Sequence, residues 1–257
     1  MELNSKSALQ TVKKVLAADF ACDESDFDKD GVFINQAQEM PGRRKLPFRE
    51  KQLNIATLGK GVVISCSAER LEWAKENLGK LSKDDIFNTS TMSLISEYIS
   101  PDNQTVGGTD LKYICIPDRF RPYAPGNDVK LTALDYKEIK QYFETQEFSY
   151  AIGKRDNPDH LHQIAVSAVC DGKIAGIGAA SEDCEEMYQV GIHVLPEYRD
   201  KGIGRALVSK VTEKIFEKGR LSYYSTWASN LASRRLNISL GYFPAWIELY
   251  VKDKGER

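Results

Sequence analysis

The feature that most constrains this chain is a glycine-bearing turn between an apolar strand and an amphipathic helix, within EEMYQVGIHVLPEYRDKGIGRALVSKV at 185–211. Glycines at such a turn leave backbone N–H groups bare and close together, and the helix dipole adds partial positive charge there. Arg199, Lys201 and Arg205 bring further positive charge to the same place. The stretch therefore predicts a ligand that carries phosphate.

Two common phosphate-binding motifs do not fit this turn. A P-loop requires GxxxxGK[ST], and the chain contains no such string. A dinucleotide-binding turn requires a third glycine three positions after Gly204, where Leu207 stands. On the glycines alone, a turn that binds nothing is the alternative.

At these residues the chain resembles the GNAT superfamily of N-acetyltransferases. The acyl-CoA motif of that family, R/Q-x-x-G-x-G/A preceded by V-x-P, stands here as Val194-Leu195-Pro196 and Arg199-Asp200-Lys201-Gly202-Ile203-Gly204. A second family element is an Asn that opens a later helix ending in Gly-aromatic, which corresponds to Asn230 and Gly241-Tyr242. The resemblance covers about residues 128–252 and does not evidently cover 1–127.

The resemblance implies a mixed α+β or α/β fold with a splayed central sheet flanked by helices, and acyl-CoA in the opening. It implies that the backbone of Ile192, His193 and Val194 pairs with pantetheine, which Asn230 also contacts, with Ser233 nearby. An N-cap is the alternative role for Asn230, and one residue can do both. The backbone amides expected to hold the pyrophosphate are those of Arg199, Asp200, Lys201, Gly202, Ile203, Gly204, Arg205 and Ala206.

Acetyl transfer to an amine needs a base for the ammonium proton and an acid for the departing thiolate. Many family members use a Tyr seven residues after the Asn as the acid, and that position is Asn237. Many also carry a Glu on the motif strand, where this chain has Tyr188. Glu186, two residues earlier, is expected on the same strand face and could act as base directly or through water. Tyr188 and Tyr242 are possible acids. The alternatives are a solvated acid for Glu186 and packing roles for Tyr188 and Tyr242.

Two functions follow from this pattern. The first is an acetyl-CoA-dependent N-acetyltransferase that transfers the acetyl group directly, in a ternary complex, to a primary amine of a small molecule or peptide. The second is a non-catalytic acyl-CoA-binding or sensing protein with the same fold, which the missing tyrosine at 237 favours. Positioning alone gives large accelerations, and this argument favours the enzyme.

The remaining pattern predicts two domains, 1–120 and 128–257, divided at the Pro- and Gly-containing stretch 119–128. The first half reads as α+β without a catalytic motif, and is either a degenerate copy of the same fold or an unrelated module. Its expected helices are 3–16, 68–81 and 84–99, and its strands 31–35, two within 53–67, and 111–117. The second half is expected to hold strands at 129–131, 163–170, 173–180, 186–194, 222–226 and 245–251, helices at 136–143, 202–218 and 231–240, and a polar loop at 154–162.

Charge and cysteine usage limit the remaining possibilities. The 35 Lys+Arg and 37 Asp+Glu give a net charge of −2, so a grip on nucleic acid is not expected. No apolar run is long enough for a membrane span, and no signal peptide is evident. Five widely spaced cysteines without a CxxC and three histidines predict reduced thiols, a cytoplasmic protein and no metal site. The chain is expected to be a monomer or a homodimer.

Overall fold

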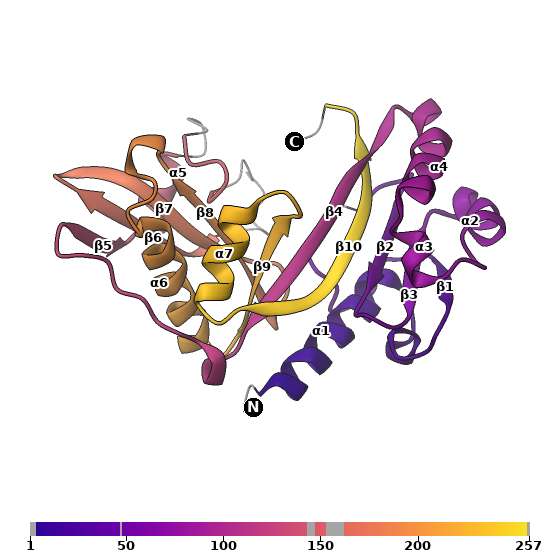
Figure 1. The fold of residues 1–257 in the computed structure, drawn as a ribbon, viewed down its shortest axis with the longest axis horizontal. Coiled ribbons are helices and arrows are strands. Elements are labelled where there is room, and N and C mark those ends of the chain that lie inside the picture. The colour runs from indigo at the N-terminus through magenta and orange to yellow at the C-terminus, as the bar shows by residue number, and fades with distance from the viewer. Residues whose placement is uncertain (1–3, 47, 143–146, 153–161, 256–257) are drawn as a thin grey trace. The chain divides into compact units, whose positions relative to one another are not determined.

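The computed structural model describes residues 4–46, 48–142, 147–152 and 162–255 (Figure 1). The chain divides into two compact units, each made of two segments. Unit 1 is Met1–Ala8 with Tyr113–Pro244, and unit 2 is Leu9–Lys112 with Ala245–Arg257. This division differs from the predicted boundary at 119–128, because residues after 244 pair with a strand of the N-terminal half.

Helices and strands are interspersed along the chain, as expected of a mixed fold. Before residue 116 they are α1 (Ser5–Phe20), β1 (Val32–Gln36), β2 (Leu53–Thr57), β3 (Val62–Cys66), α2 (Leu71–Asn77), α3 (Lys83–Ile86), α4 (Thr89–Ile99) and β4 (Gln104–Cys115). After it they are β5 (Val129–Ala133), α5 (Tyr136–Lys140), β6 (His162–Cys170), β7 (Lys173–Glu182), β8 (Met187–Val194), α6 (Ile203–Glu217), β9 (Leu221–Trp227), α7 (Leu231–Ser239) and β10 (Phe243–Asp253).

Most predicted elements lie where expected, and the exceptions have local causes. The predicted helix 84–99 is two helices, because the Asn88 side chain accepts from the N–H of Thr91 at 2.9 Å and starts α4 anew. Strand β4 begins seven residues earlier than predicted, through Gly107-Gly108. A Cβ at Gly107 would lie 2.3 Å from the Tyr250 ring, so this glycine admits the ring. Residues 143 and 154–161, within the predicted helix 136–143 and loop 154–162, lie outside the described residues.

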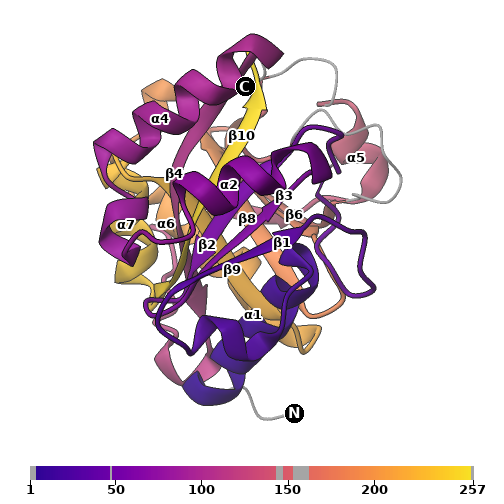
Figure 2. The same cartoon turned by 90° about the vertical axis from the view of Figure 1, so that its right-hand side faces the viewer.

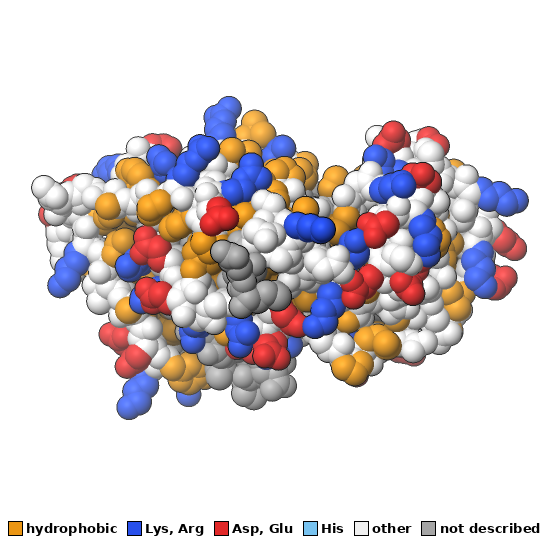
Figure 3. All heavy atoms as spheres, turned by 90° about the horizontal axis from the view of Figure 1, so that it is seen from below, with side chains coloured by type: hydrophobic (Ala, Val, Ile, Leu, Met, Phe, Trp, Pro, Cys, Tyr) orange, Lys and Arg blue, Asp and Glu red, His pale blue; other side chains and the backbone are white. Residues whose placement is uncertain are grey.

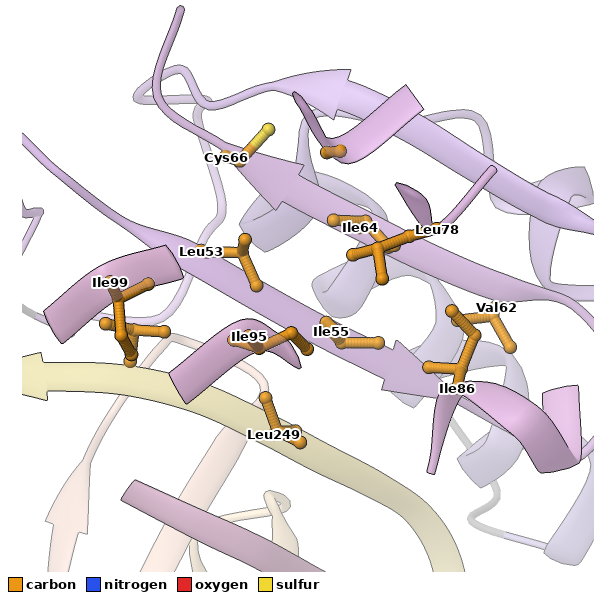
Figure 4. Packing of buried hydrophobic residues seen from close by; sticks show 12 residues of the cluster. Leu53, Ile55, Val62, Ile64, Cys66, Leu78, Ile86, Ile95, Ile99 and Leu249 are labelled. Atoms are coloured by element: carbon orange, nitrogen blue, oxygen red, sulfur yellow. The ribbon is translucent and has the colours of Figure 1, made fainter. Parts of the chain in front are cut away.

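In unit 2 the strands follow the order β1-β3-β2-β10-β4. Strand β10 pairs antiparallel with β2 from Ile247↔Thr57 to Tyr250↔Asn54, which explains why Ala245–Arg257 belongs to this unit. Helices α2, α3 and α4 cover one sheet face, and Figure 2 shows α2 and α4 in front of these strands. Figure 4 shows side chains of β2, β3 and β10 pointing at those of the helices; the labelled ones are Leu53, Ile55, Val62, Ile64, Cys66, Leu78, Ile86, Ile95, Ile99 and Leu249.

Unit 2 also buries charge. Arg44, with a side chain 3% exposed, pairs with Asp19 at 2.5 Å and with Glu248, which Lys112 meets at 3.3 Å. The Trp246 indole N–H donates to Glu248 at 2.7 Å. Burial alone would raise the pKa of Glu248, but the charges of Arg44 and Lys112 and these hydrogen bonds lower it to about 2. The cluster keeps buried charges compensated inside the unit.

In unit 1 the order is β4-β9-β8-β7-β6-β5, so strands β4 and β10 contribute residues to both units. Helix α6 packs on β6, β7, β8 and β9 with α7 beside it (Figure 1). Gly178 of β7 faces α6, since a Cβ there would lie 3.1 Å from Leu207. Ile177 and Ala179 instead join Ile139 of α5 and Phe148 in a cluster on the opposite face. Helices thus flank both faces of a mixed sheet, which confirms the predicted fold of this half.

Candidate functional site

Strands β8 and β9 separate part-way along their length. They are parallel neighbours from Met187↔Leu221 to Val190↔Tyr224, where their register ends. Both strands continue, β8 to Val194 and β9 to Trp227. Residues 191–194 of β8 are partly exposed, and their other edge stays paired with β7. An unpaired strand edge offers its backbone N–H and C=O groups to an extended ligand.

The turn from β8 to α6 places a helix N-terminus beside this opening. Two of its residues are left-handed, Asp200 with φ 60° and Gly202 with φ 76°. Helix α6 then begins at Ile203 and runs for 15 residues. The first N–H groups of such a helix have no partner within it, and together with the dipole they attract anions.

The three basic side chains of this turn do not have equal freedom. Arg199 and Lys201 are exposed, and the Arg199 Nε donates to the carbonyl of Val194 at 3.2 Å. Arg205 instead donates to the carbonyl of Ser239 at 3.3 Å and lies 4.4 Å from the centre of the Tyr123 ring. Arg205 therefore ties α6 to the end of α7, while Arg199 and Lys201 face solvent.

Both glycines of the motif are required by close packing. A Cβ on Gly204 would lie 3.1 Å from Ile192 Cδ1 and 3.2 Å from Leu236 Cδ1, so the missing side chain lets α6 approach β8 and α7. A Cβ on Gly202, already left-handed, would lie 2.5 Å from the Tyr123 hydroxyl. The glycines shape the turn from the protein's inner side.

Helix α7 begins beside the free end of β9. The Asn230 side chain accepts from the N–H of Ser233 at 3.1 Å, so it is an N-cap, and its NH₂ group has further donor capacity. The Ser233 hydroxyl lies 2.8 Å from the Tyr224 hydroxyl, at the last residue pair of β8 and β9. Cap, serine and tyrosine thus meet next to the opening.

The comparison with family models gives one match in this part of the chain. Residues 130–242 match the model of the Acetyltransferase (GNAT) family. The matched region is called the GNAT domain below, after this model. Acetyl-CoA-dependent acetylation is generic to that family. No curated protein matches the chain by sequence.

Solved structures share the fold of the GNAT domain at low identity. A GCN5-related N-acetyltransferase from Sphaerobacter thermophilus is 14% identical, covers 98% of this chain and 94% of its own, and has a TM-score of 0.51. A GCN5-related N-acetyltransferase-like protein from Streptococcus suis is 11% identical, with coverages of 64% and 68% and a TM-score of 0.50. A GCN5-related N-acetyltransferase from Kribbella flavida is 18% identical with a TM-score of 0.48, and the alignment spans 64% of its length. At these identities the first two likenesses show the fold alone.

Asn237, at the position of the family's tyrosine, is fully buried in the GNAT domain. It lies one turn after Ser233, on the same stripe of α7. Neither its Nδ2 nor its Oδ1 has a hydrogen-bond partner among the described residues. An unpaired buried amide is costly, so this position favours a polar partner that a ligand could supply.

The predicted acid–base residues lie toward the other end of β8. Glu186 lies in the turn between β7 and β8 rather than on the strand, and is partly exposed. Tyr188 is the second residue of β8 that pairs with β9, and its hydroxyl donates to the Glu182 carboxylate at 2.8 Å. Burial and this carboxylate raise the pKa of Tyr188 to about 12. The structure therefore separates Glu186 and Tyr188 from the loop residues at the free end of the strand.

His193 points away from α6, as its place in the strand predicts. Its ring lies 5.8 Å from that of Phe148 and 5.3 Å from that of Tyr150, on the face opposite α6. Burial, and then the charge of Arg199, lower the pKa of this imidazole. The backbone of His193, and not its ring, therefore lies along the unpaired edge of β8.

A polar cluster on the same face was not predicted. The hydroxyl of Tyr223 donates to Asp183 and, at 3.0 Å, to Gln189, and Ser181 donates to Asp183 at 2.7 Å. Tyr223 and Asp183 are buried. Sequence patterns cannot reveal this cluster, since its members come from three strands and a turn. The consecutive tyrosines 223 and 224 nevertheless place one hydroxyl on each face of β9.

Other chemistry has no visible centre in the parts of the chain that the structure describes. No cluster of His, Cys, Asp and Glu there could hold a metal ion. All five cysteines lie among the described residues and none forms a disulfide; burial raises the pKa of Cys66 to about 11 and of Cys115 to about 12. No described helix combines the length and the apolar character of a membrane span.

Proposed function

We propose that this chain is an acetyl-CoA-dependent N-acetyltransferase that transfers an acetyl group directly, in a ternary complex, to a primary amine of a small molecule or peptide. The observation that carries the proposal is the separation of β8 and β9 after Val190↔Tyr224, next to the N-terminus of α6. An opening with a strand edge on one side and an anion site at its end suits an extended chain that ends in a pyrophosphate.

In this proposal the free edge of β8 at Ile192, His193 and Val194 pairs with the amides of pantetheine. The backbone N–H groups from Arg199 to Ala206 hold the pyrophosphate, and the exposed Lys201 adds charge attraction. The NH₂ group of Asn230 contacts pantetheine while its oxygen caps α7. These contacts hold the thioester at the point where the strands part.

Proton transfer is the other part of the proposal. Glu186 takes the proton from the acceptor amine through water, and Tyr188 is the competing residue. About 3.3 Å of strand per residue places Met187, the residue after Glu186, roughly 10 Å before Val190, so the carboxylate of Glu186 does not contact that pair directly. Positive and negative side chains are interspersed over the face in Figure 3, and together with the net charge of −2 this supports a small or peptidic acceptor over nucleic acid.

The test is whether acetyl-CoA stabilises the protein and is consumed. Saturating acetyl-CoA, at 100 times its Kd, adds about 2.7 kcal/mol to a folded unit that binds it, so Tm rises. With a panel of primary amines, a thiol assay then measures CoA release. The absence of both a Tm shift and binding heat in calorimetry would refute the acyl-CoA assignment.

A second function is favoured by one observation, the buried Asn237 at the position of the family's acid. An amide cannot protonate a thiolate, so a chain without another acid suits an acyl-CoA-binding or sensing protein. Tight acetyl-CoA binding without CoA release from any amine of the panel would support this function.

A further inference from the structure

The GNAT domain contains a second tyrosine that can reach the reacting end of the ligand. We propose that Tyr224 is the general acid that protonates the departing thiolate, in place of the tyrosine that Asn237 replaces. This inference rests on the proposed acetyl-transfer function and assigns a residue of the same site.

Tyr224 lies at the point where β8 and β9 part, because it forms their last residue pair with Val190. A ligand that enters between the strands from their free ends stops here. The Tyr224 side chain extends under α7, because its hydroxyl meets Ser233 of that helix at 2.8 Å. The family's acid comes from this helix, one turn after Ser233.

The surroundings of the Tyr224 hydroxyl suit it to donate a proton. Tyr224 is 3% exposed, and burial raises its pKa to about 12, so the phenol is protonated near neutral pH and can donate. The Ser233 hydroxyl can donate to the phenolate oxygen once that proton has gone. Asn237, on the same stripe of α7, has an amide without a partner among the described residues. A thioester carbonyl or a pantetheine amide would supply the missing hydrogen bond.

The neighbouring Tyr242 shows what a purely structural tyrosine looks like here. Its hydroxyl lies 2.6 Å from the hydroxyls of both Thr212 and Ser222, so its hydrogen bonds close within the core. Its ring lies edge-on to that of Tyr224, with centres 6.0 Å apart. The Tyr224 hydroxyl has one hydrogen-bond partner among the described residues, the Ser233 hydroxyl in the first turn of α7 beside the opening.

The step balances without any other reagent. The amine nitrogen attacks the thioester carbon, a C–N bond forms, and the C–S bond breaks with its electron pair left on sulfur. The phenolic proton of Tyr224 moves to that sulfur and gives free CoA thiol. The proton lost by the amine returns through solvent to the phenolate, which Ser233 holds meanwhile.

The experiment compares Tyr224→Phe with Tyr242→Phe, since both remove a buried hydroxyl in the same core. Tyr224→Phe is expected to lower kcat at least about 100-fold while acetyl-CoA affinity in calorimetry is unchanged, the size expected when a general acid is lost. Tyr242→Phe is expected to lower Tm and keep kcat within a few-fold. An active wild type whose Tyr224→Phe variant keeps full kcat would refute the role of Tyr224 and leave acetyl transfer intact.

A second variant separates proton donation from packing. A fluorinated tyrosine at position 224 keeps the ring and hydroxyl but ionises at lower pH, and an acid works only while protonated. Activity is therefore expected to fall as pH rises within the measured range for this variant, while the wild type shows no such fall. Identical alkaline profiles would contradict the proposal even if Tyr224→Phe fails to fold. A wild type that binds acetyl-CoA but never releases CoA would overturn both the acid and the enzyme.

Discussion

The two units of this chain each turn from a strand into a helix beside an arginine, and they use the arginine in opposite ways. In unit 2, β3 leads through Ser67 to Arg70, whose side chain is 1% exposed and donates at 2.7 Å to both Asp102 and Gln104. In unit 1, β8 leads through an exposed turn with two left-handed residues, where Arg199 and Lys201 face solvent.

Strand pairing differs in the same way. In unit 2, β2 and β3 stay paired from Leu53↔Cys66 to Thr57↔Val62, over their full length. In unit 1, β8 and β9 part after four residue pairs. The comparison teaches that a strand–helix turn becomes a ligand site only where the strand edge beside it is open and its cations are not already neutralised.

The largest effect is expected from breaking the buried ion pairs of unit 2. Arg44→Met removes the cation between Asp19 and Glu248 and leaves two buried carboxylates undercompensated. Losing one partner of a buried pair costs roughly 3–5 kcal/mol, so the free energy of unfolding of unit 2 should fall by that order. Hydrogen exchange of the β2 and β10 amides measures it. The half-buried Arg43, changed to Met, is the matched control and should cost less than about 1 kcal/mol.

Acidification tests the same cluster without a mutation. Glu248 has a folded pKa near 2, below its ordinary value, so its contribution is complete above that ordinary value and is lost as pH falls toward 2. Unit 2 should therefore lose stability on acidification in the wild type. Between the ordinary pKa of Glu248 and pH 2, the Arg44→Met variant should lose less free energy of unfolding than the wild type. An equal loss in the two proteins would show that Arg44 does not keep the Glu248 carboxylate charged.

A smaller effect is expected from the exposed turn between β8 and α6 in unit 1. Lys201→Glu places a negative charge where the pyrophosphate is proposed to bind and should weaken acetyl-CoA about ten-fold, or about 1.4 kcal/mol. The exposed Lys218, just past the other end of α6, gives the control Lys218→Glu, which should leave affinity unchanged. Calorimetry at two salt concentrations measures both, and the Lys201 effect should shrink as salt rises. Equal losses from the two variants would point to a general charge effect.

The smallest effect is expected at the far end of β8. Glu186→Gln should lower kcat by less than about ten-fold, below the roughly 10²–10⁴-fold lost with a direct general base, because Glu186 acts only through water. The loss should shrink as pH rises and the amine arrives deprotonated. Tyr188→Phe is the companion variant, and a larger loss there would move the base to the tyrosine. Full rates in both would leave positioning as the source of catalysis.

The parts of the fold that the sequence could predict are those with local causes. The apolar stripe of α6, the hairpin between β6 and β7, and the Asn230 cap all follow from neighbouring residues. The turn between β8 and α6, which is proposed to hold the pyrophosphate, could be located because glycine and basic residues are contiguous there. Strand β4 was predicted too short, because Gly107-Gly108 looks like a loop until Tyr250, far away in the chain, lies over it.

What the sequence could not predict depends on partners distant along the chain. The membership of residues 245–257 in unit 2 requires knowing that β10 pairs with β2. The Tyr224–Ser233 contact depends on how α7 folds back over β9. The place of Glu186 in a turn was also missed, because β8 begins one residue later than the alternating pattern predicts.

The return of the chain to unit 2 has a consequence for the order of synthesis. Residues 113–244 are contiguous and can pack as soon as they leave the ribosome. The sheet of unit 2 instead waits for β10, which adds Glu248 to the Arg44 cluster and Leu249 to the apolar core. During translation, the half made first is therefore completed last, and its unpaired strands are exposed to chaperones and aggregation while residues 113–244 fold.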